Sequence, residues 1–149
     1  MRIAVGNDHG GLPLRETVLS SIEQSGNELL DFGTNSPESV DYPDFAEKVS
    51  RAILSGNADR GIIICGSGVG ACIAANKFKG IYAAVCHDTY TAHQGVEHDN
   101  MNVLCLGGRV IGSEIAREIV RAFLSAAFIN SGNYLRRVNK VRNIENQNG

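Results

Sequence analysis

The hydrophobic positions of the chain fall into short apolar runs separated by longer segments with helical spacing. Apolar runs of the kind that form buried strands lie at residues 2–6, 29–32, 61–65, 81–86 and 102–106. Between them, apolar side chains recur every three or four residues, which is typical of helices that bury one face. Helices are therefore expected from Pro13 to about Gly26, from Asp44 to about Gly56, through 71–75, over about 88–97 and over about 113–128. After Gly132 a short basic segment predicts a last helix to about Arg142, and the tail 145–149 is expected to fray.

This regular alternation of strands and helices predicts the fold class. Parallel strands need a crossover between them, usually a helix, and the sheet is then covered on both faces. We therefore expect an α/β protein with a three-layer, doubly wound, Rossmann-like sheet of five parallel strands and a C-terminal helix. A chain of 149 residues without a repeat or a linker predicts a single domain over 1–149.

The chain is organised around the run from Gly61 to Gly70. Three consecutive isoleucines without alternation indicate a strand that is buried on both faces. Cys65 ends this run, and a glycine-rich turn with exposed backbone N–H groups follows it before a helix. Such surroundings form an anion site and favour the thiolate form of a cysteine. Cys65 is therefore a candidate nucleophile or base, and a buried structural cysteine is the plainer alternative.

Composition and charge exclude several classes of function. The formal net charge of −2 gives no reason to expect nucleic acid as a partner, and no apolar stretch is long enough to span a membrane. The four cysteines form no C-x-x-C pair, which suits a reduced, cytoplasmic protein better than a disulfide framework. Basic residues gather only near the C-terminus, at Arg136, Arg137, Lys140 and Arg142.

Unusual chemistry follows three of the predicted strands. The segments are Asp8-His9, Cys65 to Gly68, and Gly107 to Arg109. The carboxyl ends of parallel strands share one edge of the sheet, so these groups are expected to converge. His98 and Asp99 come before the fifth strand and should lie at the opposite edge. His98 is therefore either structural or part of a neighbouring subunit's site.

Two other kinds of site were considered from the residues alone. A metal site is not expected, because His87, His93 and His98 lack the i, i+4 spacing of a helical zinc pair. A small dinucleotide- or nucleotide-binding module without catalysis is the alternative function, because 66–71 satisfies G-x-G-x-x-[GA] after a strand. That motif follows the third predicted strand rather than the first, and it gives Cys65 no role.

Several segments in order along the chain resemble the B-type ribose-5-phosphate isomerases, a family that includes allose- and galactose-6-phosphate isomerases. The resemblance extends to about Val138, and its most specific part is the cysteine-glycine segment with the Ala-Ala-Asn-Lys that follows it. The segments that carry it are 7–11, 41–43, 61–70, 74–77, 98–100, 102–104 and 108–110.

The resemblance implies an aldose–ketose isomerase of pentose phosphate metabolism that interconverts ribose 5-phosphate and ribulose 5-phosphate through an enediolate. Cys65 is then the base that moves the proton between C2 and C1, and Ser67 assists it. His98 is the acid/base that opens the furanose ring. Backbone N–H groups of Gly66, Gly68, Val69 and Gly70 hold the enediolate oxygen. The implied substrate-binding residues are Asp8, His9, Tyr42, Asp99, Arg109 and Arg137, with His9, Arg109 and Arg137 on the phosphate.

The same resemblance implies homodimers, sometimes tetramers, whose sites are shared between subunits, and it implies no metal and no cofactor. If the sites are shared between subunits, His98 would contribute to the site of the partner subunit. Two positions depart from the family. Asn133 stands where relatives commonly have a phosphate-binding arginine, a loss of about 1.5–3 kcal/mol if that contact is fully made, and Asp99 replaces a common asparagine. These departures suggest the hypothesis that rare or unphosphorylated sugars are also substrates.

Overall fold

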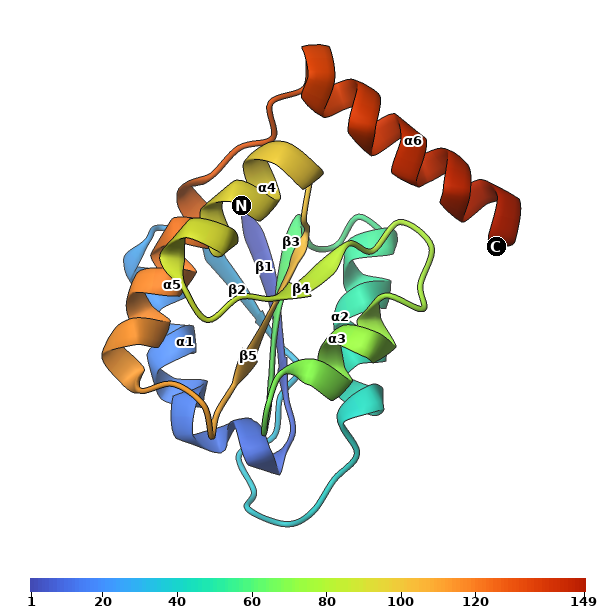
Figure 1. The fold of residues 1–149 in the computed structure, drawn as a ribbon. Coiled ribbons are helices and arrows are strands. Elements are labelled where there is room, and N and C mark those ends of the chain that lie inside the picture. Colours follow the sequence, from blue (N-terminus) through green and yellow to red (C-terminus); the bar gives the residue numbers. More distant parts are fainter.

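The computed structural model describes residues 1–149 and contains one sheet of five parallel strands (Figure 1). The strands lie in the order β2-β1-β3-β5-β4, and every neighbouring pair is parallel. This arrangement confirms the predicted fold class. The strands are β1 (Arg2–Asn7), β2 (Glu28–Asp31), β3 (Arg60–Cys65), β4 (Ala83–Val85) and β5 (Val103–Gly107).

Helices cover both faces of the sheet, as Figure 1 shows. A short 3-10 turn, η1 (His9–Gly11), precedes the first of them. One face packs against α1 (Leu12–Gln24), α4 (Thr89–Asp99) and α5 (Ser113–Ser125). The other face packs against α2 (Tyr42–Leu54) and α3 (Val69–Ala75).

Strand β3 lies at the centre of the sheet and contributes to both cores. Ile62 and Ile64 pack on the side of α1 and α5, and Ile63 and Cys65 pack on the side of α2 and α3. Each isoleucine is at least 99% buried, and such burial contributes about 1.5–3 kcal/mol per side chain. The chain therefore holds Cys65 at the end of its most firmly packed strand.

The fourth strand is shorter than the apolar run 81–86 predicts. Strand β4 has only three residues because side-chain amides occupy the backbone groups around it. Asn76 donates to the Ala83 carbonyl and accepts from the Ala83 N–H, both at 2.8 Å. The N–H of Tyr82 donates to the side chain of Asn102. Since β4 is an edge strand, Asn76 also blocks further pairing at this edge of the sheet.

The C-terminal helix is longer than predicted. Helix α6 (Gly132–Asn148) includes most of the tail that was expected to fray. Its Glu145 carboxylate accepts hydrogen bonds from the Gly80 N–H at 2.8 Å and from the Tyr82 hydroxyl at 3.1 Å. Figure 1 shows α6 standing apart from the layered body, near α4. No helix in the chain combines the length and the apolar character needed to cross a membrane.

Candidate active site

The three predicted loops meet in one pocket at the carboxyl edge of the sheet. The pocket has a volume of about 360 Å³. Cys65 lies at its base, where it pairs in register with Gly107 of β5. The residues that line the pocket are Asp8, Tyr42, Cys65, Gly66, Ser67, Gly70, Arg109 and Val110.

The turn after Cys65 aims a backbone donor at its sulfur. The N–H of Gly68 donates to Cys65 Sγ at 3.1 Å. Gly68 has a φ of 81°, a left-handed conformation that glycine adopts without strain. The same donor can also bind the sulfur in its ionised form, and hydrogen bonds to ionised acceptors are stronger than those to neutral ones.

Several other N–H groups of the same turn are left without an acceptor in the chain. The N–H groups of Gly66, Ser67 and Gly70 make no backbone or side-chain hydrogen bond. The Val69 N–H is taken by the Ser67 hydroxyl at 3.2 Å. Free backbone donors beside a buried sulfur form the arrangement that an oxyanion next to a thiolate base needs.

Two polar residues follow β1 with their orientation fixed, and of the two only Asp8 lines the pocket. Asp8 is 7% exposed, and its Oδ1 accepts from the Gly11 N–H at 3.1 Å. His9 Nδ1 accepts from the Val40 N–H at 3.2 Å. Because Nδ1 is an acceptor, the hydrogen of a neutral His9 ring lies on Nε2.

A buried polar network supports this end of the site, and the sequence pattern did not reveal it. Asn7 donates to the carbonyls of Asp8 and Thr34 at 3.0 and 2.9 Å. Arg15 in turn donates to Asn7 Oδ1 at 2.7 Å and binds both carboxylate oxygens of Asp31. Hydrogen bonds from Arg15 lower the pKa of Asp31. The network ties the loop after β2 to the loop that contains Asp8.

Two glycines let large side chains lie close to the turn. A Cβ on Gly70 would come within 2.7 Å of the Tyr42 ring, so this ring rests directly on the turn. A Cβ on Gly66 would lie 3.3 Å from the guanidinium of Arg109. The Arg109 N–H also donates to the Gly66 carbonyl at 3.0 Å. One aromatic ring and one cation therefore flank the free N–H groups.

The remaining predicted site residues do not reach this pocket. His98 and Asp99 form the last turn of α4, which extends two residues beyond the predicted end and leads into the amino end of β5. Asn133 and Arg137 are exposed on α6. Figure 1 shows that α6 and the C-terminal end of α4, which carry these four residues, lie at the opposite end of the sheet from the loop that follows β3 and Cys65.

His98 has two neighbours that the sequence analysis missed. Its ring stacks on Tyr134 of α6 with the ring centroids 4.4 Å apart. Gln94 Nε2 lies 2.9 Å from His98 Nδ1. Gln94 precedes His98 by four residues, and side chains at this spacing are neighbours on a helix. A predicted helix that continued through His98 would therefore have indicated this pair.

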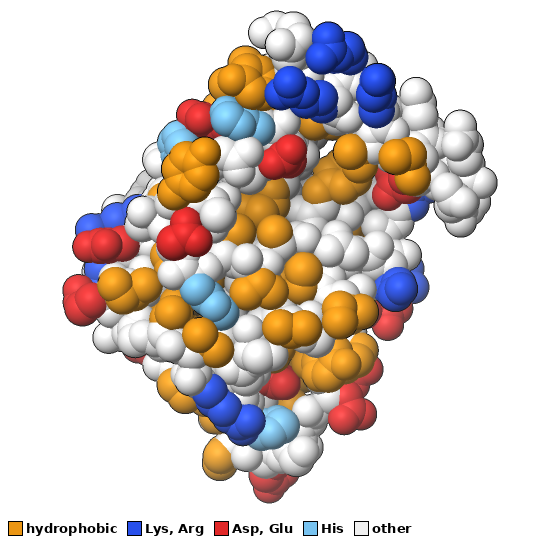
Figure 2. Space-filling model, in the orientation of Figure 1, with side chains coloured by type: hydrophobic (Ala, Val, Ile, Leu, Met, Phe, Trp, Pro, Cys, Tyr) orange, Lys and Arg blue, Asp and Glu red, His pale blue; other side chains and the backbone are white.

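The basic residues of the C-terminal segment form a surface rather than a pocket. Figure 2 shows Lys and Arg side chains gathered over α6. Arg136, Arg137 and Lys140 are exposed there, and none of them has an ion-pair partner in the chain. This surface and His98 both lie at the amino end of the sheet.

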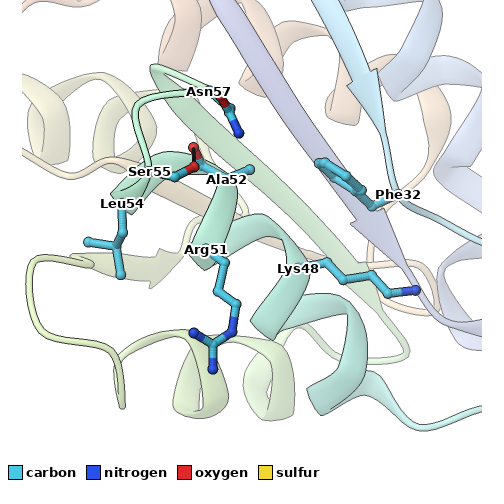
Figure 3. Close-up of a pocket in the computed structure, with 7 residues that line it drawn as sticks. All are labelled: Phe32, Lys48, Arg51, Ala52, Leu54, Ser55 and Asn57. Carbon is cyan, nitrogen blue, oxygen red and sulfur yellow. Dashed lines mark hydrogen bonds between the residues drawn. The ribbon is translucent and has the colours of Figure 1, made fainter.

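The largest cavity, about 640 Å³, lies elsewhere, between α2 and the end of β2 (Figure 3). It contains none of the predicted site residues. Its cations do not converge, because Lys48 and Arg51 point in different directions in Figure 3 and Arg51 pairs with Glu47 at 2.7 Å. The pocket at Cys65 is smaller, but it brings a buried thiol together with free backbone N–H groups. It is therefore the better candidate for an active site.

Comparison with known proteins identifies the family of the chain. Residues 3–141 match the family model for ribose/galactose isomerases. The chain is 44% identical to ribose-5-phosphate isomerase B of Escherichia coli, over 97% of this chain and 96% of the relative. It is 40% identical to D-erythrulose-4-phosphate isomerase of Pectobacterium atrosepticum, over 99% of this chain and 97% of the relative.

Solved structures extend the likeness to three dimensions. The structure of Clostridium thermocellum ribose-5-phosphate isomerase B superimposes with a TM-score of 0.95 at 47% identity, over the full length of both chains. The type B enzyme of Leishmania infantum matches with a TM-score of 0.94 at 41% identity, over 99% of this chain and 98% of that one. Sequence and fold therefore agree, and the chain belongs to the ribose/galactose isomerase family.

Proposed function

We propose that this protein interconverts ribose 5-phosphate and ribulose 5-phosphate through an enediolate. The observation that carries the proposal is the buried Cys65 sulfur beside free backbone N–H groups in a pocket of about 360 Å³. Membership of the ribose/galactose isomerase family supports the same reaction. The alternative of a nucleotide-binding module gives no role to the cysteine, and no relative described above supports it.

The chemistry follows from the residues of the pocket. The Cys65 thiolate takes the proton from C2 of the open-chain aldose, and the electron pair of that bond forms the C1–C2 double bond of the enediolate. The pair of the C1–O1 double bond moves onto O1, and the hydrogen of the O2 hydroxyl passes to O1. The proton on sulfur then returns to C1 as the C2–O2 double bond forms, which gives the ketose. The free N–H groups of Gly66, Ser67 and Gly70 stabilise the negative oxygen of the intermediate, and the Ser67 hydroxyl assists.

Substrate binding divides into a sugar end and a phosphate end. Asp8, Tyr42 and Asp99 contact the sugar, with Asp8 already buried in the pocket. His9 and Arg109, supplemented by Arg137, bind the phosphate through charge-assisted hydrogen bonds. Arg109 lies against the turn, next to Gly66.

A second copy of the chain completes each site. Cys65 and His98 lie at opposite ends of the sheet, so one substrate cannot contact both within a single chain. In a homodimer, or a tetramer built from such dimers, His98, Asp99, Asn133 and Arg137 of one protomer would reach the Cys65 pocket of its partner. His98 would then open the furanose ring there, since imidazole exchanges protons near neutral pH.

Mixing two inactive variants tests both the catalytic residues and the shared site. Cys65→Ala and His98→Asn should each abolish turnover of ribose 5-phosphate, measured with EDTA present. After co-expression, a heterodimer contains one site with both residues intact. Random pairing should therefore restore about one quarter of wild-type activity.

The control is the double variant Cys65→Ala/His98→Asn expressed alone. It should stay inactive, because no pairing of its chains gives an intact site. Failure of the mixture to regain activity would contradict the shared site while leaving the reaction itself intact. Wild-type protein without turnover of ribose 5-phosphate, allose 6-phosphate and galactose 6-phosphate would overturn the isomerase proposal. A binding module would keep its nucleotide affinity after Cys65→Ala.

The phosphate end suggests a wider range of substrates. Asn133 carries no charge where relatives commonly have arginine, and it is exposed on α6. We therefore expect measurable isomerisation of free aldoses or ketoses. Asn133→Arg should raise kcat/KM for ribose 5-phosphate and leave the value for free ribose unchanged. Negligible turnover of every free sugar by the wild type would contradict this part.

The chemistry of the cysteines supports a cytoplasmic location. All four cysteines are free thiols, and three of them, Cys65, Cys86 and Cys105, are buried. A base that works as a thiolate also needs a reducing compartment, because oxidation of its sulfur would remove the activity. Fractionation of the producing cells, followed by the isomerase assay, tests the location.

A further inference from the structure

The neutral ring of His98 can carry its hydrogen on either nitrogen, and its neighbours in α4 select one. Gln94 Nε2 lies 2.9 Å from His98 Nδ1 and 3.4 Å from Asp99 Oδ2. An ionised carboxylate only accepts hydrogen bonds, so the amide of Gln94 must turn its NH₂ group toward Asp99. The reverse orientation would place the Gln94 oxygen against the carboxylate. His98 Nδ1 therefore accepts, and the hydrogen of the neutral ring lies on Nε2.

The plane of the ring is also restrained. Tyr134 of α6 stacks on His98 with an angle of 26° between the two rings. Stacking on one side and a hydrogen bond at Nδ1 together fix which edge of the imidazole faces outward. No hydrogen bond within the chain occupies His98 Nε2. The free edge of the ring is thus a hydrogen-bond donor.

We propose that Gln94 and Asp99 are positioning residues that hold neutral His98 with its hydrogen on Nε2, so that it donates to the ring oxygen of a furanose. The inference rests on the proposed function, in which His98 serves the site of a partner protomer. The proposal also explains why residue 99 is an aspartate. An asparagine could accept or donate, and it would leave the orientation of Gln94 open.

The donor suits the bond that breaks. In ring opening, the bond between C1 and the ring oxygen O4 breaks, and its electron pair stays on O4. The hydrogen of the O1 hydroxyl leaves as the C1–O1 double bond forms, so that overall one hydrogen moves from O1 to O4. A hydrogen bond from His98 Nε2 stabilises the charge that develops on O4.

Three variants change the tautomer in different ways. Gln94→Glu replaces the donor with an acceptor, which places the imidazole hydrogen on Nδ1 and leaves a lone pair on Nε2. Gln94→Met keeps the length of the side chain and removes both polar groups. Asp99→Asn keeps the shape and releases the amide of Gln94. Gln24→Met, at the exposed end of α1, is the matched control for the loss of an amide on a helix.

The first measurement reads the tautomer directly. Nitrogen-15 NMR of histidine-labelled protein at pH 8 distinguishes a protonated ring nitrogen from a bare one, and a His98→Asn spectrum assigns the signals. Wild type and Gln24→Met should show His98 with its hydrogen on Nε2, and Gln94→Glu should show it on Nδ1. A wild-type ring with its hydrogen on Nδ1 would overturn the proposal whatever sugar the protein accepts.

The second measurement separates ring opening from proton transfer at carbon. Ribose 5-phosphate is mostly a closed ring. D-Erythrulose 4-phosphate and its aldose isomer cannot form a five-membered ring, because their O4 carries the phosphate. Gln94→Glu should lower kcat for ribose 5-phosphate by about tenfold and leave any turnover of the tetrose unchanged, whereas structural damage would lower both.

The outcomes also distinguish this inference from the proposed function. Equal kcat values for wild type and Gln94→Glu on ribose 5-phosphate would contradict the role of Gln94 while the protein remains an isomerase. A wild type without any isomerase activity would instead overturn the proposed function, and the NMR result would still report the tautomer. Asp99→Asn should give a mixture of the two tautomers.

Discussion

His87 Nε2 accepts a hydrogen bond from the backbone N–H of Gly107 at 2.9 Å. Gly107 is the last residue of β5, and the next N–H along the chain, that of Gly108, donates to the Cys65 carbonyl at 2.8 Å. A neutral imidazole can accept at Nε2, and a protonated one cannot. The end of β5 beside the pocket therefore depends on neutral His87.

This contact predicts a pH dependence of stability. Burial lowers the pKa of His87 below its usual value near 6.5. At a pH between the lowered pKa of the folded chain and the usual pKa of the unfolded chain, only the unfolded chain binds the proton. The free energy of unfolding therefore falls as the pH drops below about 6.5. His87→Gln keeps an acceptor that does not titrate. Urea unfolding at pH 7.5 and 5.5 should show a smaller loss for the variant than for the wild type, and equal losses would contradict the assignment.

Arg15→Ala should lower the free energy of unfolding by about 3 kcal/mol, because it leaves Asn7 and Asp31 without their buried donor. The pKa of Asp31 is lowered by Arg15, so the contribution of this pair is present above about pH 4 and is lost as the pH falls further. Arg51→Ala removes an exposed pair with Glu47 and is the control, with an expected cost below about 0.5 kcal/mol. Urea titration measures both.

Gly70→Ala should impair activity more than stability. The new methyl group would meet the Tyr42 ring, and alanine is otherwise favourable in helix α3. We expect KM for ribose 5-phosphate to rise as the ring moves out of the pocket. The double variant Gly70→Ala/Tyr42→Ala removes the clash, so its KM should match that of Tyr42→Ala alone. Separate, additive effects of the two substitutions would show that the contact is not responsible.

Cys72 should be the most reactive thiol outside the catalytic site. The neighbouring thiol of Cys105 lowers the pKa of Cys72 to about 7, and the same neighbour, together with burial, raises the pKa of Cys105 well above its usual value. In a Cys65→Ser background at pH 7.5, iodoacetamide should label Cys72 before Cys86 and Cys105, as peptide mass spectrometry would show. Preferential labelling of Cys86 would be the contrary result.

The fold was predictable from the sequence because its central strands β1, β3 and β5 are buried on both faces and therefore read as uninterrupted apolar runs. The failures have a different origin. The N–H of Tyr82, just before β4, is taken by the side chain of Asn102, and α6 is extended through Glu145, which reaches Gly80 and Tyr82 more than sixty residues away. Such long-range polar contacts leave no trace in local hydrophobic spacing.

The candidate site was predictable to a similar extent and for a similar reason. Asp8, Cys65 and Arg109 follow strands, and parallel strands bring their carboxyl ends together. The contacts that orient these groups were not visible. The spacing of the first predicted helix gives no sign that Arg15 binds Asn7, and the helix expected to end near residue 97 did not connect Gln94 with His98.

The distance between Cys65 and His98 has a consequence for how the protein responds to dilution. If each site needs both ends of two protomers, a lone chain is inactive, and turnover per chain is set by the fraction of chains that are paired. Specific activity should therefore fall once the protein concentration drops below the dissociation constant of the dimer. An ordinary rate assay over a dilution series would then measure how tightly two copies bind each other.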